Sequence, residues 1–142
     1  VRGADLTVAY TFLRSTFEDD GPGEASRRGN LIPGLPEHRL FARLRYDDGR
    51  LFGAFDLEWV GTRFADDANE VSAPAHTLAD LRVGTRFALS RQLGGELNLG
   101  IRNLFDVDYV ENVRANAFGG RSFEPGPPLH VYGALSLRFA GE

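Results

Sequence analysis

Few side chains in this chain have the types and spacing that enzyme chemistry requires. His38, His76 and His130 lie far apart in sequence, and no carboxylate stands at a metal-ligand spacing from any of them. Cysteine is absent, which excludes disulfides and thiolate metal sites. No Ser-His-Asp set, catalytic carboxylate pair or phosphate-binding loop is present. The sequence therefore predicts that the chain is not an enzyme and carries no cofactor or metal.

Two polar segments offer oxygen atoms, and each has a simpler structural interpretation. Residues 66–70 (Asp-Asp-Ala-Asn-Glu) carry hard oxygen donors that could bind calcium. They lack EF-hand spacing, so we favour a solvated acidic loop. Residues 103–106 (Asn-Leu-Phe-Asp) stand at the end of a predicted strand, where Asn and Asp close turns by bonding to the backbone. We expect Leu104 and Phe105 to pack beneath that turn.

Six stretches of the chain alternate apolar and polar residues, which is the periodicity of a β-strand. The clearest one places Leu135, Leu137 and Phe139 on one face, with Ser136 and Arg138 on the other. In a helix these apolar positions would fall on opposite sides and leave no apolar stripe. The sequence predicts strands over residues 4–17, 38–47, 51–64, 77–90, 93–103 and 129–139.

The connections between the predicted strands alternate in length. Asp47-Asp48-Gly49-Arg50 and Ser90-Arg91-Gln92 are tight, and the first has the Asp-Gly chemistry of a hairpin turn. The other three connections are long. Long loops at one end and short turns at the other are typical of an outer-membrane barrel, in which the long loops are extracellular.

Composition agrees with a single all-β unit. The 142 residues form one domain at most, and 17 glycines suit turns and close strand contacts. Mean hydropathy is −0.25 and no apolar run of about 18 residues exists, so we expect no transmembrane helix. The first residues lack a secretory signal, and the absence of methionine leads us to expect a piece of a larger product. A net charge of −4 gives no electrostatic basis for binding nucleic acid.

The two faces of the predicted strands differ as lipid and a watery lumen require. One face is almost wholly apolar, and the other carries charges. On the apolar face Tyr46, Phe87 and Phe139 fall near the short turns, whereas Phe12 and Trp59 fall near the long loops. Aromatic residues at these two levels of the sheet indicate an aromatic girdle at each membrane interface.

The polar faces carry arginines with more than one possible role. These side chains could guide an anion or hold a plug, or they could pair with Asp56, Glu58, Asp80 and Glu96 on neighbouring strands. Because both signs of charge are interspersed, we favour pairing. The arginines are Arg39, Arg43, Arg45, Arg82, Arg86, Arg102 and Arg138.

Two other classes of protein fit part of the pattern. A small, complete outer-membrane barrel with a structural or adhesin role needs at least eight strands for closure, and six are predicted. A soluble β-sandwich or lipocalin-type binding module would bury its apolar faces in an interior core. The two-level aromatic pattern does not favour that arrangement.

The sequence also resembles a known family. Residues 103–109 (Asn-Leu-Phe-Asp-Val-Asp-Tyr) resemble the Asn-Leu-Phe-Asp-x-x-Tyr segment near the C-terminus of TonB-dependent outer-membrane receptors. Residues 120–128 resemble the proline-rich approach to the last strand of those receptors, and residues 31–39 and 75–82 resemble their loop-to-strand junctions. The resemblance covers about residues 1–139. Many members stop at the final aromatic residue, whereas here residues 140–142 follow it.

The resemblance implies an all-β fold, an antiparallel up-and-down meander of about six strands that is the C-terminal part of a 22-stranded transmembrane β-barrel. Residues 1–142 would be the C-terminal segment of the barrel domain, with the plug domain absent from them. Such receptors lie in the bacterial outer membrane and import scarce nutrients, mostly ferric siderophores, with energy from TonB. The implied partners are outer-membrane lipid, the plug and remaining strands of the same protein, TonB through the missing N-terminal part, and an iron chelate. Nucleic acid is not expected.

The long connection before the last strand is the candidate substrate-binding element. If Phe139 marks the periplasmic end, the last strand runs inward and this connection reaches the extracellular mouth. Its central part, residues 113–123, contains Arg114, Asn116 and Arg121. In a receptor of this kind, these side chains could contact an anionic chelate or close over it.

Overall fold

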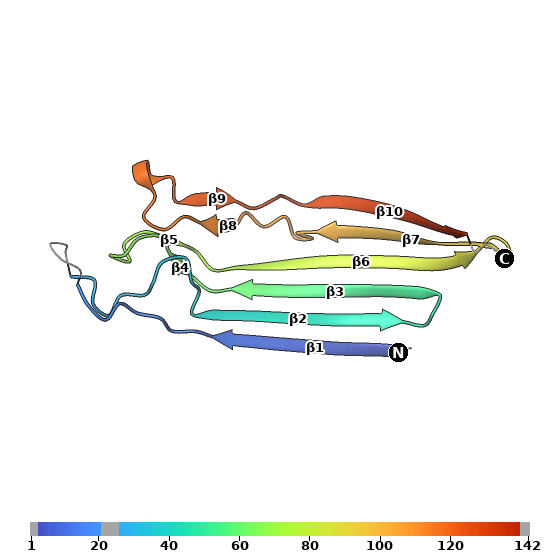
Figure 1. The fold of residues 1–142 in the computed structure, drawn as a ribbon, viewed down its shortest axis with the longest axis horizontal. Coiled ribbons are helices and arrows are strands. Elements are labelled where there is room, and N and C mark those ends of the chain that lie inside the picture. The colour runs from blue at the N-terminus through green and yellow to red at the C-terminus, as the bar shows by residue number, and fades with distance from the viewer. Residues whose placement is uncertain (1–2, 21–25, 140–142) are drawn as a thin grey trace.

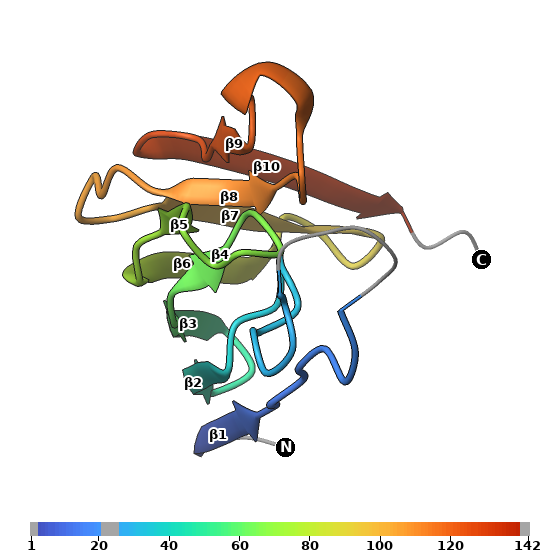
Figure 2. The same ribbon diagram turned by 90° about the vertical axis from the view of Figure 1, so that its left-hand side faces the viewer.

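The computed structural model describes residues 3–20 and 26–139, and its main element is one curved sheet of six long strands (Figures 1 and 2). Each of these strands pairs antiparallel with its neighbour along the chain, in the order β1-β2-β3-β6-β7-β10. This is the up-and-down meander that the alternation predicts. The strands are β1 (Gly3–Phe12), β2 (His38–Asp47), β3 (Leu51–Val60), β6 (His76–Ala88), β7 (Leu93–Arg102) and β10 (His130–Phe139).

The predicted strand bounds agree with the structure to within two residues, except at the C-terminal ends of β1 and β3. β2 has the predicted bounds, but β1 ends at Phe12 rather than at residue 17. The next residues turn away to bind their own loop, where the Phe17 N–H donates to the Asn30 carbonyl at 3.0 Å. β3 ends at Val60 rather than at residue 64, because β4 (Arg63–Phe64) leaves the main sheet and pairs with β5 (Ser72–Ala73).

One face of the main sheet is apolar and uncovered. Leu6 lies opposite Leu44, and Leu97 lies opposite Leu135. Leu6 is 67% exposed and Leu135 is 62% exposed. In the part of the chain that the structure describes, the buried apolar residues are small ones and one valine: Ala54, Val60, Ala65, Ala73 and Ala79. A soluble sandwich would bury large apolar side chains, so this face is an outer surface of the kind that lipid covers.

The connections sort to opposite ends of the sheet (Figure 1). The turns after β2 and β6 are tight and lie where β1 begins and β10 ends. In the first turn Gly49 has φ +98°, which a glycine adopts without strain. The Asp48 carboxylate accepts the N–H groups of Leu51 at 2.7 Å and Arg50 at 2.8 Å. None of the helical segments in the described ranges has the length and hydropathy of a membrane-spanning helix.

Aromatic side chains gather on the apolar face near the long loops. The centroid of the His38 ring lies 5.1 Å from that of Phe12 and 6.4 Å from that of Trp59. The Tyr10 hydroxyl lies 2.7 Å from Nδ1 of His38. Phe12 and Trp59 therefore share one level of the sheet, as the sequence predicts. At the other end, Phe139 pairs with the first residue of β7.

Candidate functional site at the polar face and the long loops

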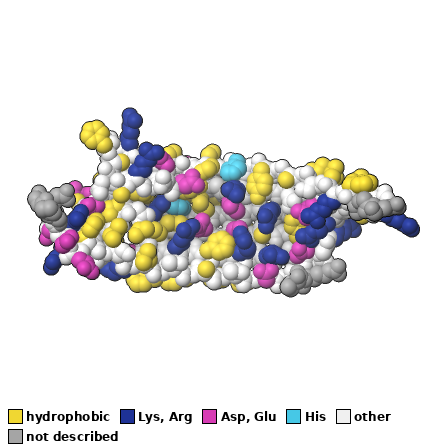
Figure 3. All heavy atoms as spheres, in the orientation of Figure 1, with side chains coloured by type: hydrophobic (Ala, Val, Ile, Leu, Met, Phe, Trp, Pro, Cys, Tyr) yellow, Lys and Arg dark blue, Asp and Glu magenta, His cyan; other side chains and the backbone are white. Residues whose placement is uncertain are grey.

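The polar face of the sheet carries ion pairs between neighbouring strands. The Arg43 guanidinium donates two hydrogen bonds to the Asp56 carboxylate, at 2.7 and 2.6 Å. Arg39 pairs with Glu58 in the same two strands, β2 and β3. Figure 3 shows charges of both signs spread along the sheet rather than gathered in one patch. The predicted pairing is confirmed for these two arginines.

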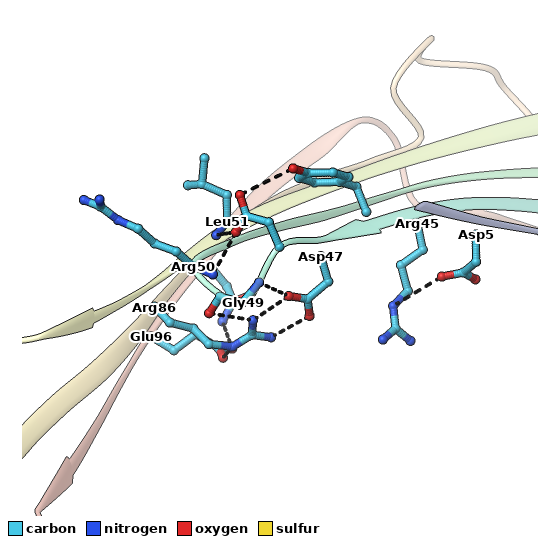
Figure 4. Close-up of polar contacts among 11 residues, drawn as sticks. Asp5, Arg45, Asp47, Gly49, Arg50, Leu51, Arg86 and Glu96 are labelled. Atoms are coloured by element: carbon cyan, nitrogen blue, oxygen red, sulfur yellow. Dashed lines mark hydrogen bonds and ion pairs between the residues drawn. The ribbon is translucent and has the colours of Figure 1, made fainter. Parts of the chain in front are cut away.

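At the short-turn end, Arg86 connects three strands (Figure 4). Its guanidinium donates to both oxygens of Asp47, at 2.9 and 3.1 Å, and its Nε lies 3.3 Å from Oε2 of Glu96. The guanidinium carbon also lies 4.4 Å from the centroid of the Phe52 ring, within the range of a cation–π contact. Arg86 of β6 therefore joins β2 to β7 on the polar face, through Asp47 and Glu96.

The remaining arginines of the polar face divide into one weak pair and three open groups. Arg45 lies 3.9 Å from Asp5, and Figure 4 shows this longer contact between β1 and β2. Among the described residues, Arg82, Arg102 and Arg138 have no hydrogen-bond or ion-pair partner. The predicted pairing is therefore not confirmed for these three. Their guanidinium groups are available to something outside the described chain.

A cavity of about 400 Å³ lies on the polar face where the strands meet the long loops. Arg63 is its most buried polar side chain, at 8% exposed. The Arg63 guanidinium donates to the Glu111 carbonyl at 3.0 Å and also to the carbonyl of Val110. Burial, and then the charge of Arg39, lower the pKa of Arg63. Polar lining residues of this cavity are Arg39, Glu58, Arg63, His76, Tyr109 and Glu111.

Tyr109 lies between this cavity and a second one of about 180 Å³, because it lines both. Its ring centroid is 5.0 Å from that of His76, and burial raises the pKa of its hydroxyl. A Cβ at position 126 would lie 2.0 Å from the Tyr109 ring, so Gly126 leaves the space that the ring fills. Phenol, guanidinium and carboxylate groups thus face one space, and such a set can hold a polar or charged ligand by hydrogen bonds.

The Asn103 corner has the structural role that the sequence predicts. Asn103 is 4% exposed at φ +50°. Its side chain donates to the carbonyls of Val107 at 2.9 Å and Pro127 at 3.2 Å, and accepts the Val107 N–H at 2.9 Å. Asp106 accepts the Leu129 N–H at 2.8 Å. The prediction that Phe105 packs beneath the turn is wrong, because its side chain is 66% exposed.

The three predicted site residues lie on one hairpin but have different surroundings. The Arg114 guanidinium pairs with Glu124, and the Arg114 N–H donates to the Ser122 carbonyl at 2.8 Å. Arg121 has no side-chain partner in the described ranges. The Asn116 amide is bonded to Asp67 of a different loop. The hairpin consists of β8 (Val110–Val113), the 3-10 turn η1 (Phe118–Gly120) and β9 (Phe123–Pro125).

The 66–70 segment contains a residue that sequence reasoning missed. Asp66 closes its own loop, because its carboxylate accepts the Val71 N–H at 2.9 Å and the Glu70 N–H at 3.3 Å. Asp67 instead bonds to both neighbouring loops. Neither Asp67 nor Arg63 has a spacing signal in the sequence, because the partners of each side chain lie about forty residues or more away along the chain.

Comparison with known proteins identifies the family. Residues 1–104 match the family described as TonB dependent receptor-like, beta-barrel. The catecholate siderophore receptor Fiu of Escherichia coli K12 is 28% identical over 136 residues, which cover 92% of this chain and 17% of that receptor. The ferrioxamine receptor of Yersinia enterocolitica is 30% identical over 109 residues, or 74% of this chain and 15% of that receptor. The chain thus spans about a sixth of the length of these relatives.

Solved structures agree on the fold. The ferric citrate transporter FecA in its unliganded form superposes with a TM-score of 0.80 at 21% identity, over 96% of this chain and 21% of that chain. The ferric preacinetobactin receptor BauA of Acinetobacter baumannii superposes with a TM-score of 0.77 at 18% identity, over 96% of this chain and 20% of that one. At these identities the likeness shows the fold alone. Together with the family match, it means that the chain belongs to the TonB-dependent receptor β-barrel family and that its six long strands are part of the wall of an outer-membrane barrel.

Proposed function

We propose that residues 1–142 are the C-terminal segment of the barrel domain of a receptor that imports a ferric siderophore across the outer membrane with TonB-derived energy. The observation that carries this proposal is the family match, together with the relatives' names. Those relatives are named as a catecholate siderophore receptor, a ferrichrome outer membrane transporter and phage receptor, and a ferrioxamine receptor. The proposal makes the protein a transporter and assigns it no catalytic activity.

The two faces of the sheet would contact different partners. The apolar face would contact outer-membrane lipid, since its leucines are exposed and do not pack into a core of the described chain. The polar face would line the lumen and meet a plug domain carried elsewhere in the same protein. Arg82 and Arg102 are open on that face and suit acidic groups of such a plug. TonB would act through the N-terminal part of the longer receptor.

The hairpin at 113–123 is the element that we propose contacts the ferric chelate. It stands at the long-loop end of the sheet (Figure 1), and Glu111, two residues before it in the chain, lines the same cavity as Arg39 and Arg63. Arg121 has no partner among the described side chains, and the Arg114 side chain is exposed although it pairs with Glu124. Two guanidinium groups at this end suit the carboxylate or phenolate oxygens of an anionic chelate. Asn116 lies in the same hairpin, between β8 and η1.

The transport proposal is tested with the longer receptor that contains this segment. Cells that depend on it for iron would be given a panel of radiolabelled ferric siderophores, with and without a working TonB. We expect uptake of at least one catecholate or hydroxamate chelate, and loss of that uptake without TonB. Failure to bind or import any ferric chelate would overturn the proposed substrate class.

Deletion of 113–123 tests the hairpin. We expect the deletion to weaken uptake while surface expression persists, because the strands of the wall do not depend on the hairpin for their ladder. Arg121→Ala should weaken chelate binding in the same direction. Arg91→Ala, which removes an exposed guanidinium at the opposite end of the sheet, is the matched control. If uptake stays normal without the hairpin, neither the hairpin nor Arg121 contacts the chelate.

A further inference from the structure

We infer that Asp67 is a positioning residue: it joins three long loops and thereby sets the pose of the 113–123 hairpin. We call the set of Asp67, Asn116 and Arg27 the loop clasp. The expected effect on chelate binding rests on the proposed function, whereas the contacts of the loop clasp are present whatever the receptor binds. Figures 1 and 2 show the three loops gathered at one end of the sheet.

One oxygen of the Asp67 carboxylate holds the hairpin. Asn116 Nδ2 donates to Asp67 Oδ1 at 2.8 Å, and the Asp67 N–H donates back to Asn116 Oδ1 at 3.1 Å. The Asn116 N–H also donates to the carbonyl of Ala65, a residue that is almost fully buried. Asn116 has φ +52°, a conformation that asparagine tolerates better than most residues. Backbone and side chain therefore fix Asn116 against the loop of Asp67.

The other oxygen of the same carboxylate holds the first long loop. Arg27 Nη1 lies 3.1 Å from Asp67 Oδ2, and both side chains are about three-quarters buried. Asn30 Nδ2 donates to the Asp67 carbonyl at 2.8 Å. Asn69 adds two bonds to Leu31, accepting its N–H at 2.7 Å and donating to its carbonyl at 2.9 Å. The two carboxylate oxygens of Asp67 thus bind different loops.

The hairpin keeps its own shape without the clasp, but its orientation would be less firmly fixed. β8 and β9 pair with each other, and the Arg114 N–H donates to the Ser122 carbonyl within the hairpin. Those bonds do not involve Asp67. Loss of the Asp67 carboxylate would therefore leave Arg114 and Arg121 on an intact hairpin that is held less firmly, by the backbone bond from Asn116 to Ala65 and by the bonds of Arg63 to β8. Since positioning decides whether charged groups meet a ligand, chelate affinity should fall while the wall of the barrel persists.

The test uses the longer receptor with four variants: Asp67→Ala, Asn116→Ala, the double variant and Asp67→Asn. We expect Asp67→Ala and Asn116→Ala each to weaken ferric-chelate binding about tenfold, with the maximal uptake rate unchanged. The double variant should weaken binding by less than the product of the two single effects, because both single variants remove the contact between Asn116 and Asp67. Asp67→Asn keeps an acceptor for Asn116 but loses the charge that meets Arg27, so its effect should be smaller. Glu70→Gln removes a carboxylate from an exposed position in the same loop and should change nothing.

Hydrogen exchange on the same variants separates this inference from the proposed function. Asp67→Ala should speed exchange in residues 26–31 and 113–123 and leave β6 and β7 unchanged. Additive losses in the double variant, or unchanged exchange in those two segments, would overturn the clasp. If the wild-type receptor binds no ferric chelate, the proposed function fails, and the exchange measurement still decides whether Asp67 joins the loops.

Discussion

The sheet and the loops above it belong to one chain but are held by different kinds of interaction. Each long strand is fixed by a continuous ladder to its neighbours, so no single side chain decides its place. The loops are fixed by single side chains that bond to distant backbone groups, as Asp67, Asn103 and Arg63 do. The stability of the sheet should therefore depend on which face a substituted residue occupies. The local stability of the loops should depend on the identity of a few polar residues.

The largest expected effect is a charge placed on the lipid face of the sheet. Leu135 lies in the middle of β10 and is exposed on the apolar face, opposite Leu97. Leu135→Arg should destabilise the intact barrel by about 2–4 kcal/mol if the site lies near the bilayer midplane. Ser136→Arg places the same charge on the polar face, opposite Glu96, and should cost far less.

Folding of the full receptor into lipid vesicles, titrated with denaturant, would measure both free energies of unfolding. Equal and small effects of the two arginines would contradict the assignment of faces. Leu135→Ala is a further control for loss of apolar contact without added charge.

In the loops, the largest expected effect comes from Asn103. Asn103→Ala removes three hydrogen bonds from a buried corner and leaves a residue with a Cβ at φ +50°. We expect a loss of about 2–3 kcal/mol in local stability. Asn98→Ala is the matched control in the sheet. Asn98 has one side-chain bond, to Glu96 at 2.8 Å, and the ladder would hold its backbone without that bond.

Asn103→Gly sharpens the same prediction. Glycine loses the hydrogen bonds but accepts a positive φ, so it should cost about 1 kcal/mol less than alanine. Hydrogen exchange of residues 103–109 reports the local free energy of opening for each variant. A cost for Asn98→Ala as large as that for Asn103→Ala would contradict the contrast between sheet and loop.

The same contrast decides how much could be predicted from the sequence. Period-two alternation marks every long strand, and β2 has the predicted bounds, because successive side chains point to two faces of the sheet that differ in polarity. The predicted strands run past residues 12 and 60, but the chain leaves the sheet there to pair within its loops. The partners of Asp67 lie about forty residues or more away in either direction. No local pattern encodes contacts of that kind, so the loop clasp became visible only in the structure.

The smallest expected effect concerns pH, and it compares one carboxylate in a loop with one in a short turn. Backbone N–H donation from Arg28, followed by the Ser26 hydroxyl, lowers the pKa of Asp20. Backbone N–H donation from Leu51 and Arg50 lowers the pKa of Asp48. Because each folded-state pKa lies below the unfolded value near 3.9, each carboxylate contributes stability at neutral pH. That contribution is lost as the pH falls through the folded-state pKa.

The consequence of that loss should differ between the two places. The Asp48 turn is also closed by a backbone bond from the Asp48 N–H to the Leu51 carbonyl at 3.0 Å, with β2 and β3 paired on either side. The Asp20 carboxylate instead accepts the N–H groups of Arg27 and Arg28, in a loop with an isolated bridge, Thr16 opposite Leu31, in place of two paired long strands. Acidification from pH 5 to pH 2.5 should therefore loosen residues 26–28 and leave residues 48–51 protected. Hydrogen exchange corrected for its intrinsic pH dependence would measure this, with Asp20→Asn as the reference for a neutral side chain. If wild type and Asp20→Asn exchanged alike at pH 5, or if both segments opened together, a single carboxylate would not hold this loop.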